Sequence, residues 1–111
     1  MQYSFSIEKD ILLVVINETR ATVDFSTEMK EDLINKIENN NKNVIIDLDA
    51  VEFVDSSFLG ALVAGLKKAT MMSGDLKIVG LQAPVKAMFE LTRLYRIFDI
   101  FETVEDALKS F

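Results

Sequence analysis

The sequence predicts an α/β domain in which a mixed central β-sheet of four to five strands packs with about four α-helices. Short apolar runs rich in valine and isoleucine alternate along the chain with longer segments whose apolar residues recur every three or four positions. Half of the 111 residues are hydrophobic, which is enough for one core. No linker, repeat or low-complexity tract is found, so residues 1–111 are expected to form a single domain.

The first third of the chain is expected to form a β-hairpin followed by an amphipathic helix. Residues 3–7 alternate apolar and polar side chains, and residues 11–16 are apolar throughout, which predicts two antiparallel strands joined by a polar turn. Residues 25–37 carry apolar side chains at helical spacing. Asp24 and Ser26 are the candidate N-caps of this helix.

A strand, a polar turn and a helix are predicted in the middle of the chain. The β-branched run at residues 44–46 predicts a buried strand, and a short extended piece follows at residues 51–54. The polar turn 55–57 precedes a helix from about residue 57 to residue 72. Gly74 is expected to take a left-handed conformation after this helix.

The last third of the chain is expected to contribute two more strands and two more helices. Residues 76–79 predict a short strand, and Pro84 fits the first turn of the helix that follows. Residues 97–101 are expected to be extended. Thr103 then begins an approximate capping box for a final helix over residues 104–111.

Composition excludes several classes of function. The chain has no cysteine and no histidine, so it offers no thiol nucleophile, histidine base, disulfide or structural zinc site, and we expect no metal or cofactor. The net charge of −6 and the lack of a basic cluster argue against nucleic-acid binding. No segment is long and apolar enough to insert into a membrane, and no secretory signal is seen, so a cytoplasmic location is expected.

Two acidic residues follow the central strand and raise the alternative of an enzymatic or phospho-accepting site. Asp47 and Asp49 stand where a magnesium or phospho-accepting aspartate would be placed in a receiver-like domain. The accompanying acidic pair, lysine and glycine-rich loop are missing, so turn residues are the favoured interpretation. A nucleotide-binding or hydrolytic α/β domain is therefore the less favoured hypothesis.

The turn Asp55-Ser56-Ser57 is the candidate functional site. Aspartate and serine are preferred N-caps, so capping alone is one explanation of these residues. Beside them, Phe58, Ala61 and Gly65 follow one another along one side of the predicted helix. This line is expected to lie off the buried stripe and to be partly exposed, as in a docking surface for a partner. The buried stripe is assigned to Leu59, Leu62, Leu66 and Ala69.

The segment IIDLDAVEFVDSSFLGALVAGLKKA resembles the signature of STAS domains, the fold of bacterial anti-sigma factor antagonists, also called anti-anti-sigma factors. In that family an apolar strand ending in D-L precedes a spacer, a D-S-[STA]-G-L-G turn and a helix. The segments GDLKIV, PVKAMFELT, LYRIF and TVEDAL are similar to the downstream part of the family, so the resemblance covers roughly residues 3–110.

The resemblance implies a bacterial regulator of transcription that works by partner switching and is not an enzyme. Ser56 would be the phosphorylation site, with Asp55 and Ser57 beside it in the binding surface. The unphosphorylated protein would bind an anti-sigma factor with GHKL-type serine kinase activity and free a sigma factor. Phosphorylation would end that binding, and a PP2C-type phosphatase would restore it. A monomer or weak dimer is expected.

A different role on the same fold is the alternative. A STAS subunit of a stressosome-like complex or of a lipid-transport ATPase would use the same helix face as a permanent interface, and Ser56 would be only a cap. The chain also departs from the family motif, because Phe58 stands where the family has a glycine after the second serine. Phe58 either fills the space that the glycine leaves or adds an apolar anchor for a partner.

Overall fold

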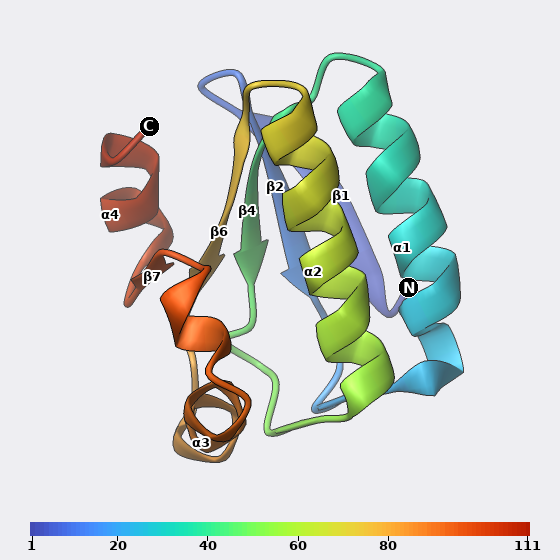
Figure 1. Cartoon of the computed structure of the whole chain (residues 1–111), viewed down its shortest axis with the longest axis vertical. Helices are drawn as coiled ribbons and strands as arrows, with labels where there is room; N and C mark the ends of the chain where they lie inside the picture. The colour runs from blue at the N-terminus through green and yellow to red at the C-terminus, as the bar shows by residue number, and fades with distance from the viewer.

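The computed structural model describes residues 1–111 and contains a five-stranded mixed β-sheet in the order β1-β2-β4-β6-β7 (Figure 1). β1 is antiparallel to β2, and the remaining neighbours are parallel. The strands span Tyr3–Glu8 (β1), Ile11–Ile16 (β2), Asn43–Asp47 (β4), Asp75–Val79 (β6) and Ile100–Phe101 (β7). The predicted α/β class, the hairpin and the strand count are confirmed.

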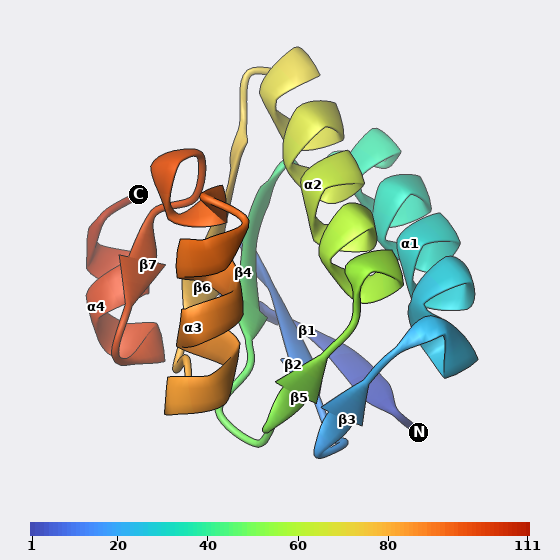
Figure 2. The same ribbon diagram turned by 60° about the horizontal axis from the view of Figure 1, so that its bottom comes forward.

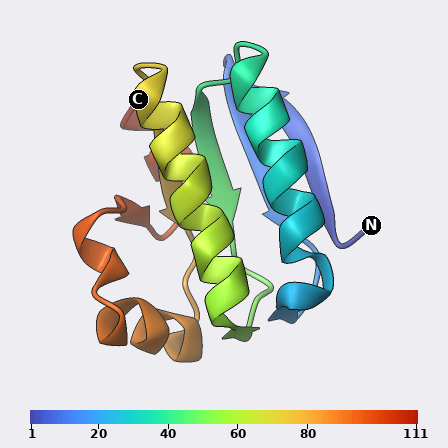
Figure 3. The ribbon, with the colours of Figure 1, turned by 45° about the vertical axis from the view of Figure 1, so that its right-hand side comes forward.

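Two long helices cover one face of this sheet. They are α1 (Val23–Glu38) and α2 (Ser56–Met71), which lie side by side with their N-termini at the same end (Figures 1 and 3). The short helix α4 (Val104–Lys109) covers the opposite face against β4, β6 and β7. Each long helix therefore packs both on the sheet and on the other helix.

The remaining elements lie at the carboxyl edge of the parallel strands. β3 (Arg20–Ala21) and β5 (Phe53–Val54) pair in parallel as a separate two-stranded sheet, just before α1 and α2 respectively (Figure 2). Helix α3 (Ala83–Leu91), with Pro84 in its first turn, is followed by a 3₁₀ turn at Leu94–Arg96. The pairing of β3 with β5 brings the N-termini of α1 and α2 close to each other.

The main core lies between the sheet and the α1–α2 layer. Its largest fully buried side chains come from β1, β2, β4, both long helices and α3, and include Tyr3, Ile16, Leu33, Ile46, Phe58, Leu62 and Phe89. A smaller cluster of Ile11, Ile45, Val79 and Ala107 packs under α4. The central strand β4 is thus apolar on both faces, as its unbroken β-branched run predicts.

Tyr3 ties the hairpin to α1. Its ring is buried, and its hydroxyl donates to Asp32 Oδ2 at 2.5 Å, while Glu28 Oε1 lies 3.2 Å away as a second acceptor. Burial first, and then the two carboxylates, raise the pKa of Tyr3 above its ordinary value. The phenol therefore stays protonated and keeps donating to α1, which holds the edge strand against the helix layer.

Several element boundaries differ from the sequence prediction. The N-cap of α1 is Thr22, whose hydroxyl accepts from the Asp24 amide at 3.3 Å, so neither Asp24 nor Ser26 caps this helix. The predicted strand at residues 97–101 is reduced to Ile100–Phe101, because the chain first makes the 3₁₀ turn. The last helix ends at Lys109, and Thr103 caps it as predicted.

The structure contains no helix with both the length and the apolar character that crossing a lipid bilayer requires.

Candidate functional site

The turn Asp55-Ser56-Ser57 lies where the N-termini of α1 and α2 come together. Asp55 has an extended backbone, with φ −106° and ψ 176°, and is the N-cap of α2, which begins at Ser56. The backbone amide of Asp55 donates to the carbonyl of Ala21 at 3.3 Å, so the turn continues the pairing of β3 with β5. The position of the turn is set by a parallel strand pair that connects segments far apart in the sequence.

The carboxylate of Asp55 accepts hydrogen bonds from both long helices. Oδ1 accepts from the amide of Phe58 in α2 at 2.9 Å, and Oδ2 accepts from the amide of Val23 in α1 at 2.9 Å. Unpaired amides and the positive end of the helix dipole at each N-terminus favour a negative group there. The Asp55 side chain thus stabilises the N-termini of both helices and links them to each other.

Ser57 is tied to α1 by a second contact. Its hydroxyl lies 2.6 Å from the hydroxyl of Ser26, which is only 1% exposed. Ser57 itself is half-buried. Its hydroxyl is therefore engaged in the interface between the helices and is poorly placed for reaction with another protein.

Ser56 differs from both neighbours. It is the first residue of α2, its side chain is exposed, and its hydroxyl forms no hydrogen bond within the chain. It lines a shallow depression with Thr27 and Lys30 of α1. Of the three side chains in the turn, Ser56 is the one whose polar atom is free.

The structure contradicts the expected exposure of Phe58, Ala61 and Gly65. Phe58 is 0% exposed, Ala61 is 2% exposed and Gly65 is buried. The line faces α1 and not solvent, because α2 packs against its neighbouring helix as well as against the sheet. The prediction that these three residues are partly exposed is therefore wrong.

Two contacts show how closely this line packs against α1. The ring of Phe58 meets the ring of Phe25 edge to face, with centroids 6.1 Å apart. A Cβ atom at Gly65 would lie 2.7 Å from Leu33 Cδ2, so the absence of a side chain there lets the helices approach. Apolar periodicity predicts one buried line and one partly exposed line of side chains on α2, but the line of Phe58, Ala61 and Gly65 is buried as well.

Asp47 and Asp49 are turn residues at the end of β4. Asp47 Oδ1 accepts from the Asp49 amide at 2.9 Å. Burial raises the pKa of the Asp47 carboxyl, partly opposed by that hydrogen bond. The turn interpretation of this pair agrees with the hydrogen bond, which is the local contact that aspartate forms in such turns.

Sequence reasoning missed three side chains of the site, which all lie on α1: Ser26 as a partner of Ser57, Thr27 and Lys30. Ser26, Lys30 and Ile34 are spaced four residues apart and form a second, mostly half-buried line beside the main apolar stripe. A polar line next to an apolar stripe was the available signal that α1 has two packed sides. Only the tertiary structure shows that this line of α1 lies next to the turn at residues 55–57.

Replacing Asp55 by alanine is expected to lower the free energy of unfolding by about 1–3 kcal/mol. Loss of one N-cap costs about 0.5–2 kcal/mol, and Asp55 serves two helices. Urea denaturation monitored by circular dichroism measures the change. Replacing Asp24, which is in the first turn of α1 but caps nothing, is the matched control and should cost less than about 1 kcal/mol. Equal losses for the two variants would contradict the double cap.

Comparison with known proteins connects this geometry to one family. The family model described as "STAS domain" matches residues 7–107. A Thermotoga neapolitana protein named as a candidate anti-sigma factor antagonist is 25% identical over 108 residues, covering 96% of this chain and 95% of the relative. The anti-sigma F factor antagonist of Paenibacillus polymyxa is 24% identical over 67 residues, covering 60% and 57%.

The fold is also similar to solved structures. An anti-sigma-factor antagonist (STAS) domain protein from Planctomyces limnophilus superimposes with a TM-score of 0.89 at 19% identity, covering 97% of this chain and 96% of the other. At this level of identity the likeness shows the shared fold. The predicted fold class and the resemblance seen in the sequence are both confirmed.

Proposed function

This chain belongs to the STAS domain family, and from that premise we propose that it is an anti-sigma factor antagonist switched by phosphorylation of Ser56. In its unphosphorylated form it binds an anti-sigma factor with GHKL-type serine kinase activity, and a sigma factor is released. The phosphorylated form does not bind, and a PP2C-type phosphatase restores the binding form. The protein acts as a regulator and substrate, and its own chain supplies no catalysis.

The single observation that carries this proposal is the free hydroxyl of Ser56. The carboxylate of Asp55 is used by two helix amides, and the hydroxyl of Ser57 is used by Ser26. Ser56 alone combines exposure with an unused hydroxyl at the point where the two helices begin. A kinase can therefore reach it without opening the fold.

The modification itself would leave the fold in place. Transfer of the γ-phosphoryl group of ATP forms a bond from phosphorus to Ser56 Oγ, releases ADP and passes the hydroxyl proton to a base of the kinase. The product carries about −1.5 to −2 charges at a helix N-terminus, where an anion is favoured. Since Ser56 Oγ supports no hydrogen bond, nothing in the native structure is lost.

The same charge would strongly oppose binding to a partner. A hydrated phosphate beside the exposed edge of the turn must lose its water when a partner covers it, which costs several kcal/mol without a paired cation. Each 1.4 kcal/mol is tenfold in affinity, so the switch needs no conformational change. The contact surface centres on Asp55, Ser56 and Ser57, while Phe58, Ala61 and Gly65 support it from behind.

Binding and phosphorylation assays with the anti-sigma kinase test the switch. Ser56→Ala is expected to abolish phosphorylation while it keeps binding, and Ser56→Asp is expected to weaken binding at least about tenfold. Ser57→Ala is the matched control, since its hydroxyl faces Ser26, and it should remain a substrate. Isothermal titration calorimetry gives the affinities, and mass spectrometry locates the phosphate.

Two results would overturn the proposal. One is tight binding of the anti-sigma kinase by the protein phosphorylated on Ser56. The other is phosphorylation of the Ser56→Ala variant on Ser57 at the wild-type rate. A permanent interface in another assembly would instead leave Ser56→Asp and the wild type equal in affinity for their partner.

A further inference from the structure

A small depression separates the N-terminal halves of α1 and α2 beside Ser56. Its volume is about 240 Å³, and its walls are formed by residues of these two helices alone: Ser26, Thr27 and Lys30 from α1, and Ser56, Ser57, Gly60 and Ala61 from α2. Five of these seven residues carry a hydroxyl or ammonium group. The depression is therefore polar, and it opens next to the free hydroxyl.

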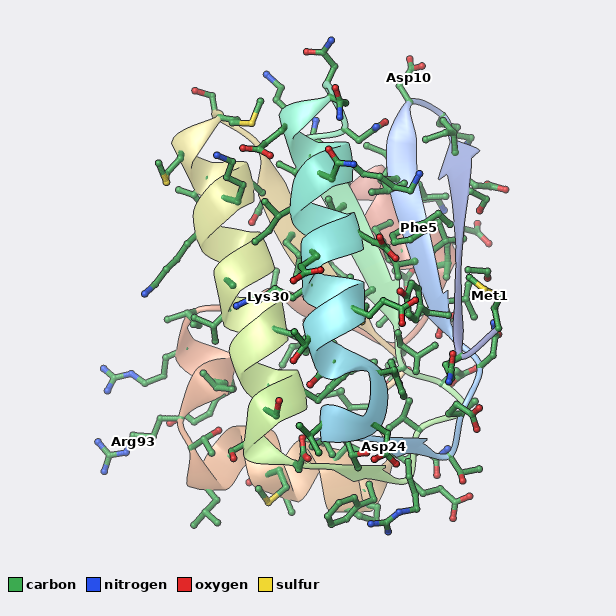
Figure 4. The ribbon with its side chains drawn as sticks, turned by 90° about the vertical axis from the view of Figure 1, so that its right-hand side faces the viewer. Met1, Phe5, Asp10, Asp24, Lys30 and Arg93 are labelled. Carbon is green, nitrogen blue, oxygen red and sulfur yellow. The ribbon has the colours of Figure 1, made fainter.

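Lys30 is the one charged residue in its lining. No carboxylate lines the depression, although the chain as a whole carries a net charge of −6. The three ion pairs of the structure use Lys68, Lys77 and Lys109, so Lys30 has no ion-pair partner. It is half-buried, and Figure 4 shows its side chain extending from α1 toward α2. An unpaired cation thus stands within the same depression as Ser56.

No acidic residue lies three or four positions from Lys30 on α1. Residues three and four positions away on α1 are its neighbours on the helix surface, and they are Ser26, Thr27, Leu33 and Ile34. The carboxylate nearest in sequence to Ser56 belongs to Asp55, and it already accepts two amides. The side chain of Lys30 is therefore available for a new anion.

Gly60 contributes a part of the wall that has no side chain. It lies one turn after Ser56, and a Cβ atom built there would have no other atom within 4 Å. This contrasts with Gly65 one turn further on, where a Cβ atom would meet Leu33. The space next to Gly60 is thus open, and the depression is not closed by a side chain at this position.

We infer that this depression receives the phosphate of phosphorylated Ser56 and that Lys30 pairs with it, an inference that rests on the proposed function. The ligand is a serine phosphate monoester of this same chain. The ammonium group of Lys30 and the hydroxyl of Thr27 supply donors from α1, so the modified residue of α2 becomes linked to the opposite helix. One ammonium group offsets only part of the charge of about −1.5 to −2 on the phosphate, so the modified turn still opposes burial against a partner.

Phosphorus-31 NMR of protein with phosphoserine at position 56 tests the pairing. The phosphoserine is installed by genetic encoding, so no kinase is needed. A nearby cation favours the dianion and should lower the second pKa of the phosphate by about one unit from its usual value of about 6. Lys30→Gln should raise this pKa toward that of a phosphoserine peptide and leave only the shift that the helix N-terminus causes, and Lys30→Arg should keep it low.

Lys67→Gln is the matched control. Lys67 is exposed on α2 and does not line the depression, so its removal changes the net charge equally without removing the partner of the phosphate. Equal pKa values in the wild type and a phosphoserine peptide would overturn the inference. Equal shifts in the Lys30 and Lys67 variants would overturn it too. A second measurement, the nitrogen-15 shift of the Lys30 ammonium, should change on phosphorylation.

The proposed function and the role of Lys30 are tested by different results. If the anti-sigma kinase does not phosphorylate Ser56, the proposed function is wrong, whatever the NMR titration shows. If Ser56 is phosphorylated and loses its partner while the phosphate titrates as in a free peptide, only the role of Lys30 is wrong.

Discussion

Replacing Phe58 by alanine is expected to lower the free energy of unfolding by about 3–5 kcal/mol, the usual cost of truncating a buried phenylalanine. The ring is 0% exposed and packs edge to face on Phe25, inside the α1–α2 layer. The loss combines the transfer free energy of the ring with the cavity that it leaves. Chemical denaturation followed by far-ultraviolet circular dichroism measures the change.

Phe53 provides the matched control. It lies five residues earlier, is 43% exposed, and contacts Arg20 with the guanidinium carbon 4.3 Å from the ring centre. Its replacement by alanine should cost about 1 kcal/mol or less, the worth of an exposed cation–π contact. A Phe58→Ala variant as stable as Phe53→Ala, but unable to bind the anti-sigma kinase, would show that Phe58 is an anchor for the partner and not a core residue.

Replacing Gly74 by alanine is expected to destabilise the domain by about 1–3 kcal/mol or more, the range for overpacking. A Cβ atom at Gly74 would lie 2.1 Å from the backbone oxygen of Lys42, at the start of β4. A side chain can avoid a clash by changing its rotamer, but a backbone oxygen cannot. The chain between α2 and β6 would therefore have to move. The shift in the midpoint of urea denaturation measures the cost.

The neighbouring Ser73 should respond in the opposite direction. Ser73, and not Gly74, has the left-handed backbone after α2, with φ of 65°. This conformation costs a residue with a side chain about 1–2 kcal/mol, so Ser73→Gly should stabilise the domain by up to that amount. A destabilising Ser73→Gly would contradict the left-handed conformation of Ser73, and a neutral Gly74→Ala would contradict the close approach of Gly74 to Lys42.

Most elements of the fold could be predicted because their signals are local. The hairpin follows from alternation in residues 3–7 and an apolar run in residues 11–16. Helix α2 was placed within one residue of its observed bounds by the polar turn before it and by its periodicity. Pro84 and Thr103 mark the starts of α3 and α4 because each fits the backbone of a first helical turn.

The parts that could not be predicted depend on contacts between distant segments. The cap of α1 was misplaced because Asp24, Ser26 and Thr22 all suit an N-cap, and only the pairing of β3 with β5 selects where α1 begins. Leu91 lies on the apolar side of α3 by its helical spacing but is 79% exposed. Periodicity shows that a residue lies on an apolar side, but it does not show whether another element covers that side.

At the candidate site, the sequence by itself determined the order of strand, polar turn and helix and the presence of a serine in the polar turn before the helix. These are properties of a short segment, so local pattern and capping preference are sufficient to find them. Only the tertiary structure decided that Asp55 accepts from the amides of two helices, that Phe58, Ala61 and Gly65 are buried, and that Lys30 and Ser56 line one depression. The physical reason is that α1 begins at Val23 and α2 at Ser56, far apart in the sequence, and their packing on one face of the sheet creates each of these contacts.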